Sequence, residues 1–194
     1  MTQTQRYSTV AITLHWLIAV LIIVMIFAGW RTDDMRQALL AGDMSVDPQT
    51  VAMLFNWHKT IGLLILTLSI VRLVWRLTHK QPSLPEGMNG FERFAATATH
   101  RAFYVLIIGM PLFGWIAASA SSFPSYFLNM ESLPIPQLVG DDEALYGVVA
   151  QIHSKSAWAI LGLLALHIAA ALKHHFIDRD DVLTRMVVFL KPRG

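Results

Sequence analysis

The sequence predicts an all-α protein that crosses a membrane as a four-helix bundle. Of its 194 residues, 55% are hydrophobic and only 14% are charged, whereas soluble domains carry about 25% charged residues. Four apolar segments lie between the charged patches, and each is near the roughly 20 residues that a hydrocarbon core of about 30 Å requires. Backbone groups in lipid must find partners within their own segment, so we expect helices rather than strands. We expect residues 1–194 to form a single integral-membrane domain.

The four predicted spans cover approximately residues 10–30, 57–77, 102–120 and 151–172. The first is not followed by a small-residue cleavage site, so we expect a retained helix and not a signal peptide. The third contains Pro111, which predicts a kink. Between the second and third spans, residues 90–100 predict a short amphipathic helix. After the third, residues 121–150 contain no lysine or arginine and should fold over the outer mouth, with a short helix near residues 141–149.

The distribution of charge predicts the orientation. One side of the predicted bundle holds most of the 15 basic residues, and the other holds most of the 13 acidic residues. Cytoplasmic connections carry the excess of lysine and arginine, so both termini should be cytoplasmic. The basic tail that begins at Lys173 is explained by this rule and by anionic lipid headgroups, with no need for nucleic acid. The basic residues on the predicted cytoplasmic side are Arg6, Arg72, Arg76, Lys80, Arg93, Arg101, Lys173, Arg179, Arg185, Lys191 and Arg193.

Four histidines lie within or at the ends of the apolar spans, where ionisable side chains are costly and usually have a function. His153 and His167 are fourteen residues apart on the fourth span, which is about 21 Å along a helix with only about 40° of rotation. Matching by depth pairs His58 with His153 near the outer side, and His15 with His167 near the inner side. Two such pairs suit two b haems, each held by two imidazoles.

Other assignments compete with haem at these positions. Each histidine could instead be a hydrogen-bonded structural residue. A single tetrahedral zinc site is excluded, because the two pairs would lie about 20 Å apart. The chain has no cysteine, which also excludes disulfides, iron–sulfur clusters and thiolate-bound haem.

Six neighbouring residues complete the predicted site. Gly62 lies one turn after His58 and leaves room for a flat macrocycle. Arg72 could pair with a haem propionate, although arginines near helix ends also extend to lipid headgroups. Lys59 and Lys155 could attract an anion at the outer side. His100 and His174 could relay protons to a quinone, or bond a propionate, at the inner side.

Five stretches carry a resemblance to a known family. They are HWL at His15–Leu17, WHKTIG at Trp57–Gly62, VRLVWR at Val71–Arg76, GMPLFGW at Gly109–Trp115, and the block His153–Met186. The chain thus resembles the prokaryotic cytochrome b561 family along nearly its whole length. The resemblance implies a four-helix bundle in the bacterial inner membrane. It also implies two b haems on the four paired histidines and electron exchange with ubiquinone.

Three functions remain open at this point. Some members of the family resemble superoxide:ubiquinone oxidoreductases, so the first function is an enzyme that passes electrons from superoxide to quinone. The second is an electron-transfer subunit or anchor for a partner dehydrogenase or a periplasmic redox protein. The third is a structural or transport protein without haem, whose preparation would be colourless.

Overall fold

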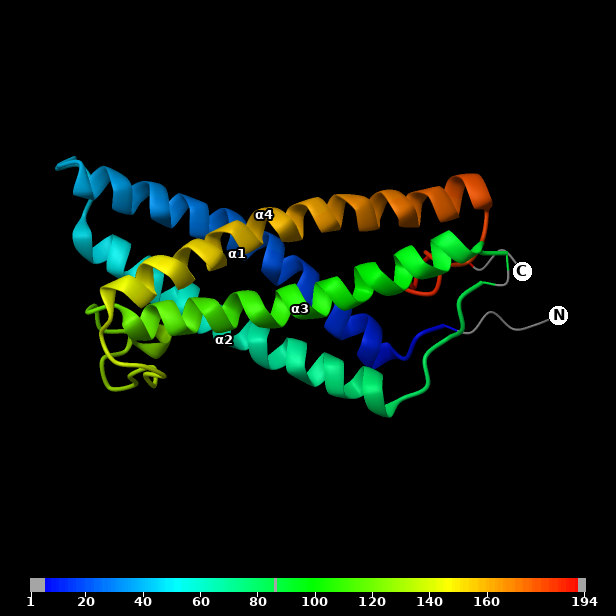
Figure 1. Ribbon diagram of the computed structural model, residues 1–194, viewed down its shortest axis with the longest axis horizontal. Helices are drawn as coiled ribbons and strands as arrows, with labels where there is room; N and C mark the ends of the chain where they lie inside the picture. The colour runs from blue at the N-terminus through cyan, green and yellow to red at the C-terminus, as the bar shows by residue number, and fades with distance from the viewer. Residues whose placement is uncertain (1–5, 86, 192–194) are drawn as a thin grey trace.

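A computed structural model describes residues 6–85 and 87–191, and it has the predicted all-α architecture. Figure 1 shows the four long helices side by side. All four are long and apolar enough to span a membrane, and no strand occurs in the described part of the chain. The elements are α1 (Thr9–Leu40), α2 (Pro48–Thr78), α3 (Gly90–Ala120), a 3-10 turn η1 (Phe127–Asn129), α4 (Glu143–Lys173) and a π-helical turn η2 (His174–Asp178).

Each predicted span lies within a longer helix. Short separate helices were expected at residues 90–100 and near residues 141–149. Instead, residues 90–100 are continuous with α3, and residues 143–149 are the start of α4. The start of α3 is fixed by a capping box, in which Asn89 accepts from the Glu92 backbone N–H and Glu92 accepts from the Asn89 N–H. The Asp142 side chain accepts from the Leu145 N–H and begins α4 in the same manner. Since each helix begins at its capping residue, it extends beyond the apolar run.

Helices that are consecutive in the sequence pack against each other, α1 with α2, α2 with α3, and α3 with α4. The two ends of the chain meet at one end of the bundle. There Arg6 donates hydrogen bonds to the carbonyls of Val188 and Leu190, and Trp16 donates to the Met186 carbonyl. We call this the inner end and the opposite one the outer end.

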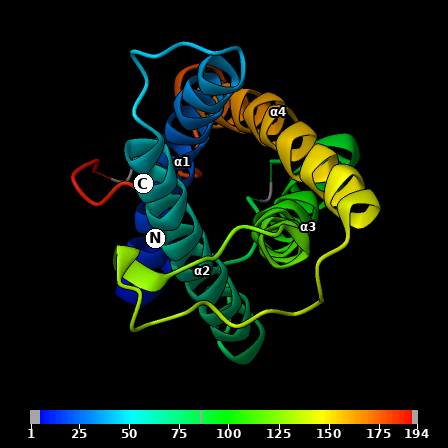
Figure 2. The same ribbon diagram turned by 90° about the vertical axis from the view of Figure 1, so that its left-hand side faces the viewer.

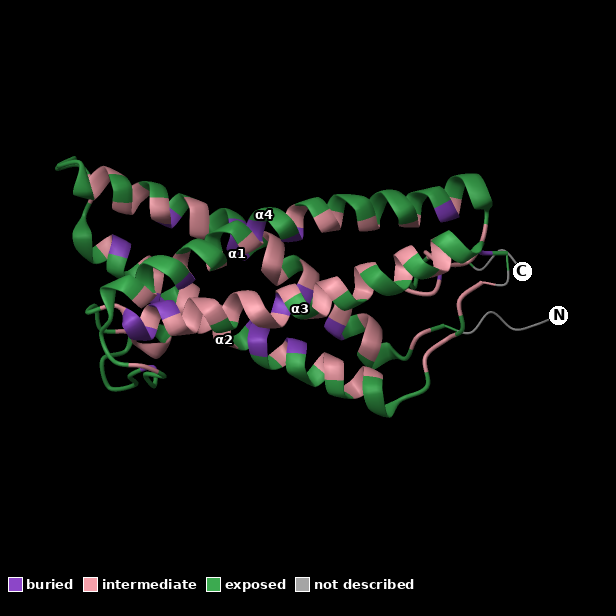
Figure 3. Cartoon of the chain, in the orientation of Figure 1, coloured by how far each residue is buried: buried purple, intermediate pink, exposed green. Residues whose placement is uncertain are grey.

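Few of the described residues are buried, as the colouring in Figure 3 shows. The main core cluster consists of Ile26 from α1 with Ala157 and Ile160 from α4, packed against side chains that include Trp30 and Met110. Large apolar side chains such as Val20, Phe27 and Val105 instead point outwards and are more than half exposed. An apolar exterior of this kind fits a lipid environment. The helices therefore meet in a narrow core and leave much of their apolar surface for lipid.

The connection between α3 and α4 crosses the outer end of the bundle. Figure 2 shows it running from α3 to the N-terminal half of α2, where η1 lies, and then returning to α4. The buried Asn56 side chain holds it there: its amide donates to Asn129 Oδ1 at 2.9 Å and accepts from the Tyr126 N–H at 3.1 Å. Thr60 also accepts from the Leu128 N–H. Part of the predicted outer cover is thus attached to the helix that carries His58.

Candidate functional site

The structure brings the four histidines together as two pairs. The rings of His58 on α2 and His153 on α4 have their centroids 6.1 Å apart, with 76° between their planes. The rings of His15 on α1 and His167 on α4 have their centroids 6.3 Å apart, at 67°. The first pair lies towards the outer end of the bundle and the second towards the inner end, because α4 begins at the outer end.

These separations fit one metal ion between the rings of each pair. An imidazole nitrogen binds a metal at about 2 Å, and the ring centroid lies roughly 1 Å behind that nitrogen. Two rings on opposite sides of one ion therefore have centroids about 6 Å apart. Both pairs have that separation, so the residues present fit two centres with two axial imidazoles each.

The ring nitrogens differ in their hydrogen bonds. His153 Nδ1 lies 2.8 Å from the Met110 carbonyl oxygen, so Nδ1 carries the proton and donates, and Nε2 remains the ligand atom. The Nδ1 atoms of His15 and His58 are buried and have no hydrogen-bond partner among the described residues. Buried polar atoms are normally bonded. The contacts of His15 and His58 therefore do not support a structural, hydrogen-bonded role for these rings.

The two pairs are separated by apolar packing. Along α4, Ala157 and Ile160 lie between His153 and His167, and they contact Ile26 of α1. The fourteen-residue spacing on α4 corresponds to about 21 Å. The outer and inner pairs are therefore two distinct centres.

Glycines create space beside the rings in two different ways. A side chain added at Gly62 or at Gly162 would meet no atom within 4 Å, so both positions border open space. Gly29 and Gly114, which the sequence analysis missed, instead contact the rings of the outer pair directly. Gly114 lies in the GMPLFGW stretch that carries the family resemblance, and Gly29 is a glycine inside an otherwise bulky apolar span, but neither pattern indicates contact with a histidine ring.

A cluster of rings and a half-buried cation surround the inner pair. The centroid of the His167 ring is 5.7 Å from that of the His100 ring and 5.4 Å from that of the Phe103 ring. The Arg72 guanidinium lies 5.9 Å above the Tyr104 ring. No carboxylate among the described residues forms an ion pair with Arg72. A half-buried guanidinium without a carboxylate is well suited to a ligand that brings one, such as a haem propionate.

His174 lies in an ion-pair cluster instead of beside His167. Its Nδ1 is 2.7 Å from Asp180 Oδ2 and 3.1 Å from Asp178 Oδ2. Lys173 pairs with the same Asp178 and with Glu92 of α3. The ring is almost fully buried at the inner end, in the π-helical turn η2. His174 can thus share a proton with the Asp180 carboxylate. Among the described residues, its ring makes no contact with the His100 ring.

The two predicted lysines occupy the outer end separately. Lys59 Nζ donates to Ser125 Oγ of the outer connection at 2.7 Å and is half-buried. Lys155 is exposed and, among the described residues, donates to Gln151 of its own helix at 3.3 Å. Each lysine is within two residues of an outer-pair histidine, His58 or His153. Their charges are thus held on the two helices that supply the outer pair.

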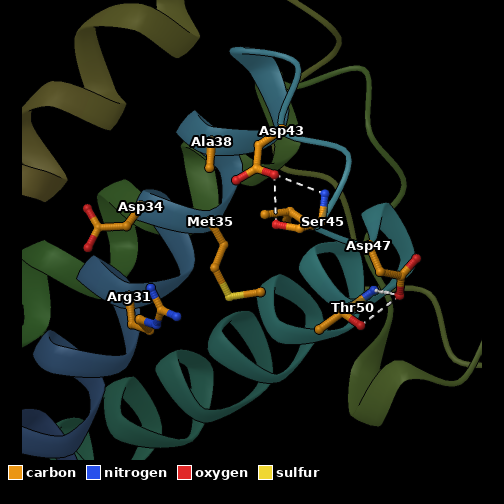
Figure 4. Close-up of a pocket in the computed structure, with 9 residues that line it drawn as sticks. Arg31, Asp34, Met35, Ala38, Asp43, Ser45, Asp47 and Thr50 are labelled. Carbon is orange, nitrogen blue, oxygen red and sulfur yellow. Dashed lines mark hydrogen bonds between the residues drawn. The ribbon is translucent and has the colours of Figure 1, made fainter.

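A cavity of about 440 Å³ at the outer end holds none of the histidines (Figure 4). It lies between α1 and the start of α2, and acidic residues dominate its polar lining. Hydrogen bonds from Ser45 lower the pKa of Asp43, and hydrogen bonds from Thr50 lower that of Asp47. Both carboxylates thus serve the turn and the N-terminus of α2, and the cavity is not part of the histidine site. Its lining comprises Arg31, Asp34, Met35, Ala38, Asp43, Ser45, Val46, Asp47 and Thr50.

The chain is similar in sequence to known proteins over almost its full length. The chain is 28% identical to cytochrome b561 homolog 2 of Escherichia coli K12, over 94% of this chain and 92% of the relative. It is 26% identical to the probable superoxide oxidase CybB of Yersinia pestis, over 98% and 99% of the two chains. It is 28% identical to cytochrome b562 of Cereibacter sphaeroides, over the full length of both. Residues 6–188 match the sequence model of the prokaryotic cytochrome b561 family. The chain therefore belongs to this family and is a multi-pass membrane protein that binds b-type haem.

Proposed function

We propose that this protein carries electrons across the bacterial inner membrane between an outer donor and ubiquinone, with superoxide as the donor. The observation that supports this most is the two separate histidine pairs, whose ring centroids are 6.1 Å and 6.3 Å apart. When bound at such a pair, a b haem supplies a one-electron carrier with no open coordination position. Two haems per chain would then form a path from one membrane face to the other.

The chain's own side chains hold this arrangement. His58 and His153 would hold the iron of the outer haem, and His15 and His167 would hold that of the inner haem. Arg72 would balance the charge of a propionate at the inner site, and its lack of a carboxylate partner among the described residues supports this role. Gly62 keeps open the space beside α2 for a flat ring.

At the outer end, Lys59 and Lys155 attract the superoxide anion. Superoxide gives up one electron and becomes dioxygen, so this half-reaction needs no proton from the protein. The relative from Yersinia pestis is named a probable superoxide oxidase, which supports superoxide over other small donors. The positive charges raise the local concentration of an anion on a face that is otherwise acidic.

At the inner end, the chain supplies protons. Reduction of one ubiquinone takes two electrons, from two superoxide ions, and two protons to give the quinol. His100, beside the His167 ring, and His174, hydrogen-bonded to Asp180, are the titratable side chains that we assign to this transfer. With both termini in the cytoplasm, these protons come from the cytoplasmic side.

One feature supports a second candidate, an electron-transfer subunit or anchor for a dehydrogenase or a periplasmic redox protein. The outer connection exposes apolar side chains, among them Phe123, Leu133 and Leu138. Such side chains could be covered by a partner protein. In that case the protein would take electrons from the partner and not from superoxide.

The purified protein in lipid nanodiscs separates these functions. We expect the reduced-minus-oxidised spectrum of low-spin b haem. Pyridine haemochrome quantification should give two haems per chain. Enzymatically generated superoxide should reduce both and yield ubiquinol when ubiquinone is present. No reduction by superoxide, with a stoichiometric protein that co-purifies, would favour the second candidate. One haem per chain would mean that one of the two histidine pairs does not bind haem. A colourless protein prepared with ample haem would refute both candidate functions.

A further inference from the structure

We infer that Gly29 and Gly114 are positioning residues for the outer haem, because each lets a ring of the outer histidine pair lie directly against a helix backbone. The inference rests on the proposed function, in which His58 and His153 are the axial ligands. It assigns a role to two helices, α1 and α3, that supply no ligand to this site.

At Gly29 of α1, the neighbour is the ring of His58. A Cβ atom added there would lie 2.8 Å from His58 Cε1 and 3.4 Å from Nδ1, and these are its nearest atoms. Carbon atoms without a bond approach one another at about 3.5–4.0 Å. Any residue larger than glycine would therefore require the His58 ring to turn or move away.

At Gly114 of α3, the neighbour is the ring of His153. An added Cβ would lie 2.8 Å from both Cε1 and Nδ1 of that ring. The same Nδ1 donates to the Met110 carbonyl, one turn earlier on α3, at 2.8 Å. The ring can reach this carbonyl only because position 114 has no side chain. Gly114 and the Met110 carbonyl thus fix both the place and the rotation of the ring.

The inner pair has no comparable contact. None of the described glycines would place an added Cβ nearest to His15 or His167. Side-chain rings surround those histidines instead, such as Trp16 beside His15 and Phe103 beside His167. Side chains can adjust their rotamers more readily than a helix backbone can move. The outer pair is therefore the more rigidly oriented of the two.

The hydrogen bond also has an electronic effect. An imidazole that donates from Nδ1 to a carbonyl becomes a more basic ligand through its other nitrogen. A more basic ligand stabilises oxidised iron and lowers its reduction potential. Losing the bond to Met110 should therefore raise the potential of the outer haem, if that haem is retained.

The test adds a methyl group, by a glycine-to-alanine substitution, at each of two positions of α3. In Gly114→Ala the ring must move, so we expect loss of one of the two haems, or its retention with a raised midpoint potential and an altered low-spin EPR signal. In the matched control Gly109→Ala, the new Cβ meets only Phe113 Cε2 at 3.9 Å, an ordinary contact. The control should retain both haems and both potentials. Gly29→Ala should affect the same haem through His58.

A stability cycle tests the contact itself without relying on haem. We expect Gly114→Ala to lower the thermal midpoint of the full chain, and to lower it much less when His153→Ala has already removed the ring. If Gly114→Ala matches Gly109→Ala in haem content, potentials and EPR signal, the inference is wrong. A wild-type protein without haem would instead overturn the proposed function, and the cycle would still report whether Gly114 accommodates the His153 ring.

Discussion

A histidine inside a membrane helix needs partners for two ring nitrogens in a region that offers few. His153 shows how this chain meets that need at the outer site, with Nδ1 bonded to the Met110 carbonyl and Nε2 left for a metal. His58 differs, since its Nδ1 is buried without a partner in the described chain. The ring instead lies against Gly29. The two ligands of one proposed haem are thus held by different means.

The pairing of the histidines can be tested one residue at a time. His58→Leu and His153→Leu should each remove the same haem, since a haem with one axial imidazole is held weakly. His15→Leu and His167→Leu should each remove the other. Difference spectra and redox titrations should divide the four variants into two sets. The two outer-pair variants should retain one haem with the same midpoint potential, and the two inner-pair variants should retain the other. A variant such as His58→Leu that left the same haem as His15→Leu would contradict the pairing.

The pairing could be predicted from the sequence because it depends only on depth, and depth follows from residue number along a straight helix. The contacts of Gly29 and Gly114 could not be predicted. They depend on how α1 and α3 are rotated about their axes, and apolar residues on all sides of a membrane helix leave that rotation undefined. The bond from Lys59 to Ser125 was missed for a similar reason, because the path of the outer connection is not encoded by a local pattern.

At the scale of the elements, α2 does more than carry His58. Asn56, Lys59 and Thr60, all within one turn of His58, hold the outer connection by side-chain hydrogen bonds. Where the connection meets α2, Leu128 and Asn129 have positive φ angles of 51° and 59°. Such backbone is uncommon outside glycine and persists where surrounding contacts maintain it. The bonds to Asn56 and Thr60 are contacts of this kind.

Removing the Asn56 amide should release the connection from α2. Asn56→Ala removes two hydrogen bonds, one from the Tyr126 N–H and one to Asn129 Oδ1, and each such bond contributes about 0.5–1.5 kcal/mol net. We expect a lower thermal midpoint and faster proteolysis within residues 121–142. The control is Thr67→Ala on the same helix, because the Thr67 hydroxyl donates only to the Leu63 carbonyl of α2. Equal proteolysis of the two variants would show that Asn56 does not hold the connection.

The helix boundaries show which sequence signals define an element. Hydropathy marks the part of a helix that lies in hydrocarbon, and it located all four spans. It does not mark where a helix begins, which here follows the capping side chains of Ser8, Asp47, Asn89 and Asp142. Short helices were expected at residues 90–100 and near residues 141–149. These segments contribute the first turns of α3 and α4 instead, because no cap or break separates residues 90–100 and 143–149 from the spans.

At the scale of the molecule, the bundle places one histidine pair towards each membrane face, with the Ile26, Ala157 and Ile160 cluster between them. Electrons can tunnel through such apolar packing, whereas protons need polar groups or water. In the proposed function, the donor reacts at the outer end and protons enter at the inner end. The direction of the reaction across the membrane therefore depends on which end faces the cytoplasm.

The orientation can be measured directly because the chain has no cysteine of its own. Ser45, between α1 and α2, and Ser83, between α2 and α3, are both exposed and lie at opposite ends of the bundle. The excess of lysine and arginine at the inner end predicts that this end is cytoplasmic. In intact spheroplasts, a membrane-impermeant maleimide should label Ser45→Cys, and it should label Ser83→Cys only after permeabilisation. The reverse pattern would place the inner end outside, so that His100 and His174 could not take protons from the cytoplasm.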